Sequence, residues 1–120
     1  MSFTIEQFRL AGKVAIVTGA GGRGNSIGRA YALGLANAGA AVVVADINEE
    51  GAGAVAAEIN AAGGTAIGVR VDITDPASAT AMVDAATTAF GGVDILVNNA
   101  ALMAELGMLH VADVSLQEWN

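Results

Sequence analysis

Four short apolar runs recur at nearly regular intervals along the chain, and a helix-like segment separates each run from the next. The runs are residues 13–17, 41–45, 65–71 and 93–97. Strands that alternate with helices over short linkers pack as a parallel sheet with right-handed crossovers. The sequence therefore predicts a three-layer α/β fold, a Rossmann-type doubly wound sheet, formed as a single domain over residues 1–120 and ending after about four strands.

The first helix is predicted over residues 26–38. Ile27, Tyr31 and Leu35 recur at intervals of four and form its apolar stripe. Gly39 follows directly, at a place where helices often end in a left-handed residue.

Capping residues mark the start of the next two helices. Asn48 is followed by two glutamates, which suit the positive end of a helix, and Val55 and Ile59 mark the inner face. Asp75 precedes a proline, the usual residue of a first helical turn. Glycine pairs end both helices. The face predicted for the third helix carries Ala79, Val83, Ala86 and Phe90.

Composition excludes several classes of function. The net charge is −7 and only five residues are basic, which argues against a nucleic-acid partner. No apolar run is long enough to cross a membrane. Cysteine is absent and His110 is the single histidine, so we expect neither a metal site nor thiol chemistry. No secretory signal is evident, and we expect a cytoplasmic protein.

A glycine-rich stretch, TGAGGRGNSIGRA, joins the first strand to the first helix. The N-terminus of a helix offers unpaired backbone N–H groups and a positive dipole end, which stabilise a pyrophosphate. Gly19 permits a tight turn after the strand, and Gly28 lets the helix approach the strand or a cofactor closely. Ser26 adds a hydroxyl donor and can cap the helix. The stretch predicts a phosphate-binding loop.

An acidic residue, Asp46, ends the second strand about 20 residues further on, where dinucleotide-binding folds place a ribose ligand. Its carboxylate can accept both hydroxyls of the adenosine ribose, and it would repel the 2′-phosphate of NADP. The alternative is an aspartate that only starts a turn before the next helix. Arg23 in the loop could meet a 2′-phosphate or simply be solvated. The pattern predicts NAD in preference to NADP.

With these features the chain resembles the short-chain dehydrogenase/reductase family, over nearly its whole length from about Leu10. The residues that carry the resemblance are Thr18-Gly19, Ile27-Gly28, Asp46, Asp72-Ile73 and Asn98-Asn99-Ala100. It implies that Asp72 contacts the adenine with Ile73 beside it, and that Asn98 and Ala100 line the cofactor site while their segment supports the sheet. Asp72 could instead form a turn, and Asn98 and Asn99 could satisfy backbone groups at a strand end.

The sequence departs from the family pattern at three places. The loop is longer, with its extra residues around 22–25, and Ala101 stands where the family has glycine. The family's catalytic Tyr-x-x-x-Lys has no counterpart, because Tyr31 is the only tyrosine and Lys13 the only lysine. We therefore expect the cofactor-binding half of such an enzyme, without catalytic residues and inactive by itself.

The resemblance implies an NAD(P)-dependent oxidoreductase that transfers hydride between a nicotinamide cofactor and a carbonyl or secondary alcohol of a small-molecule substrate. Two alternatives remain: a non-catalytic dinucleotide-binding module, and a nucleoside-cofactor methyltransferase, against which the Asp72-Ile73 and Asn98-Asn99-Ala100 segments speak. The apolar strand at 93–97 would form an exposed edge, so we also expect a homo-oligomer.

Overall fold

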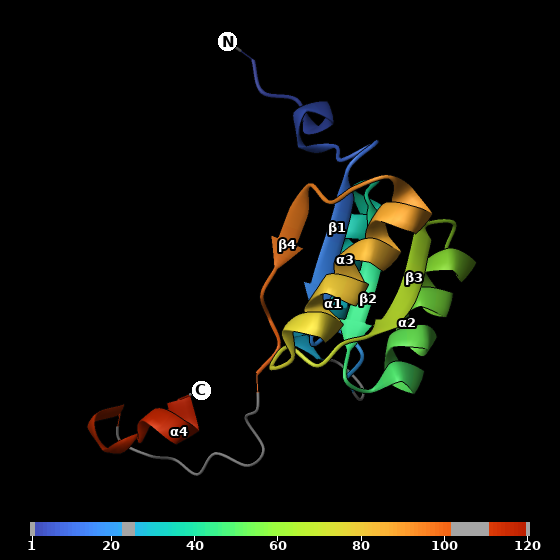
Figure 1. The fold of residues 1–120 in the computed structure, drawn as a ribbon. Coiled ribbons are helices and arrows are strands. Elements are labelled where there is room, and N and C mark those ends of the chain that lie inside the picture. The colour runs from blue at the N-terminus through green and yellow to red at the C-terminus, as the bar shows by residue number, and fades with distance from the viewer. Residues whose placement is uncertain (1, 23–25, 102–110, 120) are drawn as a thin grey trace.

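The computed structural model describes residues 2–22, 26–101 and 111–119, and within them the chain alternates strands and helices as expected (Figure 1). Residues 23–25, with Arg23 and most of the predicted loop extension, and His110 lie outside the described residues. The elements are η1 (Ile5–Phe8), β1 (Val14–Thr18), α1 (Ile27–Asn37), β2 (Ala41–Asp46), α2 (Glu49–Ala61), β3 (Thr65–Arg70), α3 (Pro76–Phe90), β4 (Ile95–Val97), η2 (Val111–Asp113) and α4 (Leu116–Trp119).

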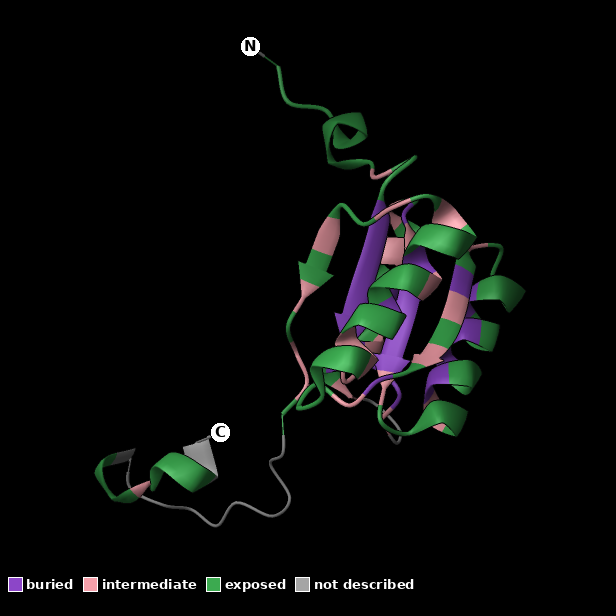
Figure 2. Ribbon diagram, viewed as in Figure 1, coloured by how far each residue is buried: buried purple, intermediate pink, exposed green. Residues whose placement is uncertain are grey.

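The four strands form one parallel sheet in the order β3-β2-β1-β4. Helices α1 and α2 cover one face, and α3 covers the other (Figure 1). Side chains of β1 and β2 alternate between these faces: Val17 and Val44 pack with α1 and α2, whereas Ile16 and Val43 pack with α3. These central strands are almost entirely buried (Figure 2). The predicted doubly wound Rossmann-type fold is confirmed.

Local signals located the helix ends well. Asn48 and Asp75 cap α2 and α3 by accepting backbone N–H groups of Gly51 and Ala77. The glycines after the helices have positive φ angles, 106° at Gly39 and 91° at both Gly63 and Gly91. Within the described residues, no helix has the length and apolarity that a bilayer crossing requires.

The apolar stripe predicted for α1 is wrong at its first two residues, whereas the third, Leu35, is partly buried and packs against the core. Ile27 and Tyr31 are 68% and 49% exposed, whereas Gly28 and Ala32 are buried. Small residues face the sheet because α1 approaches the strands too closely for large side chains. In α3, Ala86 is buried and Phe90 packs on the same core, as predicted. Met82 joins them on the inner face, and Val83 is 44% exposed, contrary to prediction.

The last strand is shorter than the predicted 93–97. Asp94 precedes it and turns its carboxylate to the neighbouring strand, where Oδ2 accepts the Val14 N–H at 2.8 Å. Only Ile95–Val97 then pair with β1. Within the described residues β4 forms an edge of the sheet, with Leu96 53% exposed.

The corrected face of α1 can be tested by a pair of substitutions. Ala32→Leu should lower the free energy of unfolding by about 1–3 kcal/mol, because the buried methyl leaves no room for a larger side chain. Tyr31→Ala on the exposed side should change it by less than about 0.5 kcal/mol. Urea denaturation measures both, and the reverse order would restore the stripe predicted from the sequence.

Candidate functional site

The carboxyl ends of the four parallel strands bring all the predicted site residues to one edge of the sheet. Gly19, Ser26, Ile27 and Gly28 follow β1, Asp46 ends β2, Asp72 and Ile73 follow β3, and Asn98 and Ala100 follow β4. In doubly wound sheets this edge is where ligands bind.

The start of α1 lies directly against the end of β1. A Cβ atom added to Gly28 would sit 2.4 Å from the Gly19 carbonyl oxygen and 2.6 Å from Asn99 Nδ2. Gly19 itself has φ of 68°, and a Cβ there would lie 2.8 Å from Ala100 Cα. These glycines therefore permit the tight turn and the close helix approach that the sequence predicted.

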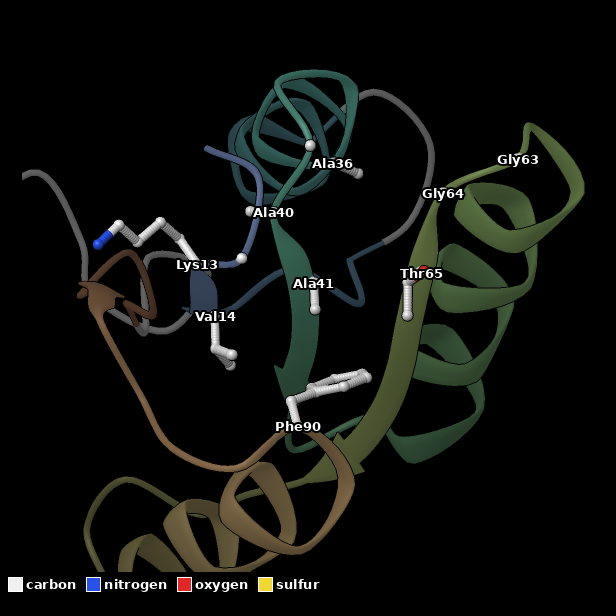
Figure 3. A pocket seen from close by; sticks show the side chains of 11 residues that line it. Lys13, Val14, Ala36, Ala40, Ala41, Gly63, Gly64, Thr65 and Phe90 are labelled. Carbon is white, nitrogen blue, oxygen red and sulfur yellow. The ribbon is translucent and has the colours of Figure 1, made fainter. Parts of the chain in front are cut away.

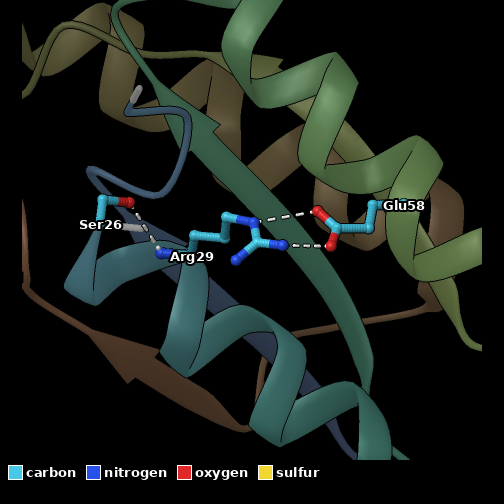
Figure 4. Close-up of polar contacts among 3 residues, drawn as sticks. All are labelled: Ser26, Arg29 and Glu58. Carbon is cyan, nitrogen blue, oxygen red and sulfur yellow. Dashed lines mark hydrogen bonds and ion pairs between the residues drawn. The ribbon is translucent and has the colours of Figure 1, made fainter. Parts of the chain in front are cut away.

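Ser26 caps α1, as predicted: its Oγ accepts the Arg29 N–H at 3.2 Å. The Arg29 side chain reaches α2, where its Nε donates to Glu58 Oε2 at 3.0 Å and its Nη2 pairs with Oε1 (Figure 4). Such a partly exposed pair contributes at most about 1 kcal/mol, but it occupies the guanidinium of Arg29, which lies in the first turn of α1. Ile27, beside the cap, is exposed at the same end of α1.

Asp46 binds backbone N–H groups with both carboxylate oxygens. Oδ2 accepts the Gly21 N–H at 3.0 Å, and Oδ1 accepts the Asn48 N–H at 2.9 Å. The second bond forms the turn that the sequence offered as an alternative role. The first ties Asp46 to the glycine loop, so the carboxylate lies beside the segment predicted to bind phosphate.

Asn99 and Thr18 join the end of β1 to the turn after β4. The Thr18 hydroxyl is buried; it donates to the Val97 carbonyl at 3.2 Å and accepts N–H groups of Asn99 and Ala100, both at 3.1 Å. The Asn99 amide donates to the carbonyl oxygens of Thr18 and Gly19. Asn99 therefore satisfies backbone groups at the strand end, whereas Asn98 is exposed at the same edge.

Asp72 forms a turn directly after β3. Its Oδ1 accepts both the hydroxyl of Thr74, at 2.6 Å, and the Thr74 N–H, at 3.0 Å. These two bonds, the hydroxyl first, lower the pKa of Asp72 below its ordinary value. Among the described residues no donor contacts Oδ2, so the turn leaves one carboxylate oxygen available. The next residue, Ile73, is 56% exposed.

A cavity of about 300 Å³ lies at the opposite edge of the sheet (Figure 3). Its lining includes the first residues of three strands, Val14, Ala41 and Thr65, and the ring of Phe90. It is therefore separate from the glycine loop, and it is not the edge at which the predicted residues gather.

Residues outside the predicted set complete the site. Asn99, rather than Asn98, makes the contacts to the glycine turn, and Gly21 and Asn48 connect the loop to α2. The repeated asparagines and the D-x-N spacing at 46–48 are visible in the sequence, but neither shows which side chain reaches the loop.

Comparison with known proteins agrees with this arrangement. The model of the short chain dehydrogenase family matches residues 13–120. An uncharacterised oxidoreductase of Mycobacterium tuberculosis is 67% identical over 90 residues, which are 75% of this chain and 35% of the relative. The chain thus spans well under half the length of this relative.

Two solved structures are similar to the chain. One, a short-chain type dehydrogenase/reductase from Mycobacterium marinum, superposes with a TM-score of 0.80 at 37% identity, over 96% of this chain and 44% of that one. The other is a 7α-hydroxysteroid dehydrogenase complexed with NADH and 7-oxo glycochenodeoxycholic acid. Its TM-score is 0.74 at 45% identity, over 79% of this chain and 36% of that one.

The role of the buried Thr18 hydroxyl can be tested by two substitutions. Thr18→Val should lower the free energy of unfolding by roughly 2–3 kcal/mol, because it leaves the Ala100 N–H without its acceptor and removes one bond each from the Asn99 N–H and the Val97 carbonyl, which still bond to each other. Thr18→Ser keeps the hydroxyl and should cost about 1 kcal/mol for the lost methyl. Equal losses in urea denaturation would show that packing, not the hydroxyl, matters at this position.

A second prediction concerns the titration of Asp72. Thr74→Val removes the hydroxyl bond and keeps the backbone one, so the pKa of Asp72 should rise part of the way toward its ordinary value. Because the folded-state pKa is lowered, the stability from these bonds is present above the unfolded pKa and is lost as the pH falls through the folded value.

An NMR titration of the Asp72 carboxyl group measures this shift. Thr80→Val is the matched control, because the Thr80 hydroxyl donates to the Pro76 carbonyl and contacts no carboxylate. An Asp72 pKa unchanged in Thr74→Val would contradict the assignment.

Proposed function

Because this chain belongs to the short chain dehydrogenase family, we propose that it forms the dinucleotide-binding part of an oxidoreductase. The enzyme would transfer hydride between a nicotinamide cofactor and a carbonyl or secondary alcohol of a small molecule. The observation that carries the proposal is the contact of Gly28 with Gly19, at the capped start of α1 and beside Asp46.

The residues at this edge fit a dinucleotide. The first N–H groups of α1 have no partner within the helix and carry its positive dipole end, which suits a pyrophosphate next to Ser26, Ile27 and Gly28. A side chain at Gly19 or Gly28 would collide with neighbouring backbone, so glycine at these two positions is what lets the start of α1 lie this close to the end of β1.

The other predicted residues then take places along the cofactor. Asp46 would accept ribose hydroxyls, Asp72 would meet the adenine with its available oxygen, and Ile73 would lie against the ring. Asn98 and Ala100 would line the path toward the nicotinamide. The nicotinamide ring itself supplies the hydride chemistry when it is bound, and the chain's residues hold and orient it.

We further propose a preference for NAD over NADP. The Asp46 carboxylate is negative and faces the loop, so a 2′-phosphate beside it would be repelled. Arg29, which could compensate, is paired with Glu58. Arg23, the other arginine near this site in the sequence, lies outside the described residues.

The remaining proposals concern the whole protein. In this sequence the fourth residue after Tyr31 is Leu35 rather than lysine, so we assign no catalytic residue within it. We propose that the protein works in the cytoplasm. We also propose that it forms a homo-oligomer, and the exposed apolar edge at β4 supports this second proposal.

Calorimetric titration of the purified chain with NADH and NADPH tests the cofactor proposal. We expect saturable NADH binding that is tighter than NADPH binding. Asp46→Ala should weaken NADH binding roughly tenfold by removing charge-assisted hydrogen bonds, and NADPH binding by less, because the repulsion is also removed. Asp84→Ala on α3, with the same charge change, should alter neither.

The two cofactors separate the possible roles of Asp46. Equal weakening of both would show that Asp46 only holds the loop. No saturable binding of either dinucleotide by a chain with folded circular dichroism would contradict the proposed function.

A further inference from the structure

Besides the Ala52 N–H that its carbonyl accepts, Asn48 makes three hydrogen bonds, and one that its side chain makes is not needed by the helix that it caps. Its Oδ1 accepts the Gly51 N–H at 3.2 Å, which caps α2, and its own N–H donates to Asp46 Oδ1. The remaining bond runs from Nδ2 to the Gly21 carbonyl oxygen at 3.4 Å. Serine or aspartate would cap α2 equally well, but neither carries an amide donor.

The glycine loop rests on the first turn of α2 at the same place. A Cβ atom added to Gly51 would lie 1.9 Å from the Gly21 carbonyl oxygen, and one added to Gly21 would lie 2.5 Å from the Ala52 nitrogen. The other polar group of Gly21, its N–H, donates to Asp46. Both backbone groups of Gly21 are thus held from the end of β2 and the start of α2.

We propose that Asn48 is a positioning residue for the dinucleotide site. It fixes the Gly21 carbonyl, and with it the orientation of the Gly21–Gly22 peptide in the glycine loop. This inference rests on the proposed function, because the loop is the segment assigned to the phosphates. A loop held before the ligand arrives loses less conformational freedom on binding, so the affinity is higher.

The test compares Asn48→Ser with Asn60→Ser. Asn60 lies near the other end of α2, and its side chain also makes two backbone bonds, both to Ala66. The same substitution there removes an amide donor from a backbone carbonyl without touching the loop. Serine at position 48 retains a capping oxygen.

Three measurements are made on each variant: the NADH dissociation constant, the hydrogen-exchange rate of the Gly21 amide without cofactor, and the melting temperature. In Asn48→Ser we expect the dissociation constant to rise roughly fivefold and the amide to exchange faster. In Asn60→Ser the melting temperature should fall, while NADH affinity and Gly21 exchange stay at their wild-type values. Unchanged affinity and exchange in Asn48→Ser, or equal losses of affinity in both variants, would overturn the proposal.

Asn48→Asp provides a second variant of nearly identical shape that keeps the cap. It should also speed exchange of the Gly21 amide, and wild-type exchange in this variant would overturn the positioning role. Failure of the proposed function has a different signature, since the wild-type chain would then bind no NADH. Exchange at Gly21, which needs no cofactor, would still decide whether Asn48 holds the loop.

Discussion

The contact between the start of α1 and the end of β1 sets the geometry of everything at the carboxyl edge of the sheet. Gly28 lies so near the Gly19 carbonyl that no Cβ atom fits between them. The contact places the N–H groups of the first turn of α1 directly over the end of the central strand. It also explains why α1 turns Gly28 and Ala32 toward the sheet and leaves Ile27 and Tyr31 exposed. Larger side chains on this face of α1 would move the helix away from the sheet and open the loop.

Two separate sets of hydrogen bonds hold this contact from opposite sides. Toward β4, Thr18 and Asn99 satisfy the backbone at the turn, including the Gly19 carbonyl itself. Toward β2, Asp46 and Asn48 hold Gly21. The loop therefore depends on residues that are distant in sequence, and a parallel sheet brings them together because all its strands end at this edge. A substitution of any of these residues is expected to alter the loop, although none of them is assigned a contact to a phosphate.

The sequence was sufficient to predict the features that depend on residues close together along the chain. The caps at Ser26, Asn48 and Asp75 and the left-handed glycines follow from local chemistry, and the buried strands follow from their apolar runs. The inner face of the first turns of α1 could not be predicted from hydrophobicity, because close packing there favours Gly28 and Ala32 over larger residues. Which of two consecutive asparagines contacts the loop was equally hidden: both follow β4, and only the folded turn brings the Asn99 amide to the carbonyl oxygens of Thr18 and Gly19.

The bonds that Asp46 makes to the turn and to the loop do not compete with its proposed role as a ligand for ribose. A carboxylate has about four acceptor positions, and the Gly21 and Asn48 N–H groups occupy two of them. The remaining positions can accept ribose hydroxyls, so one side chain can orient the loop and select the cofactor together. A substitution that merely removes the charge would then also release Gly21. Reversing the proposed preference for NAD would therefore require a replacement that repels a 2′-phosphate less but still accepts the Gly21 N–H.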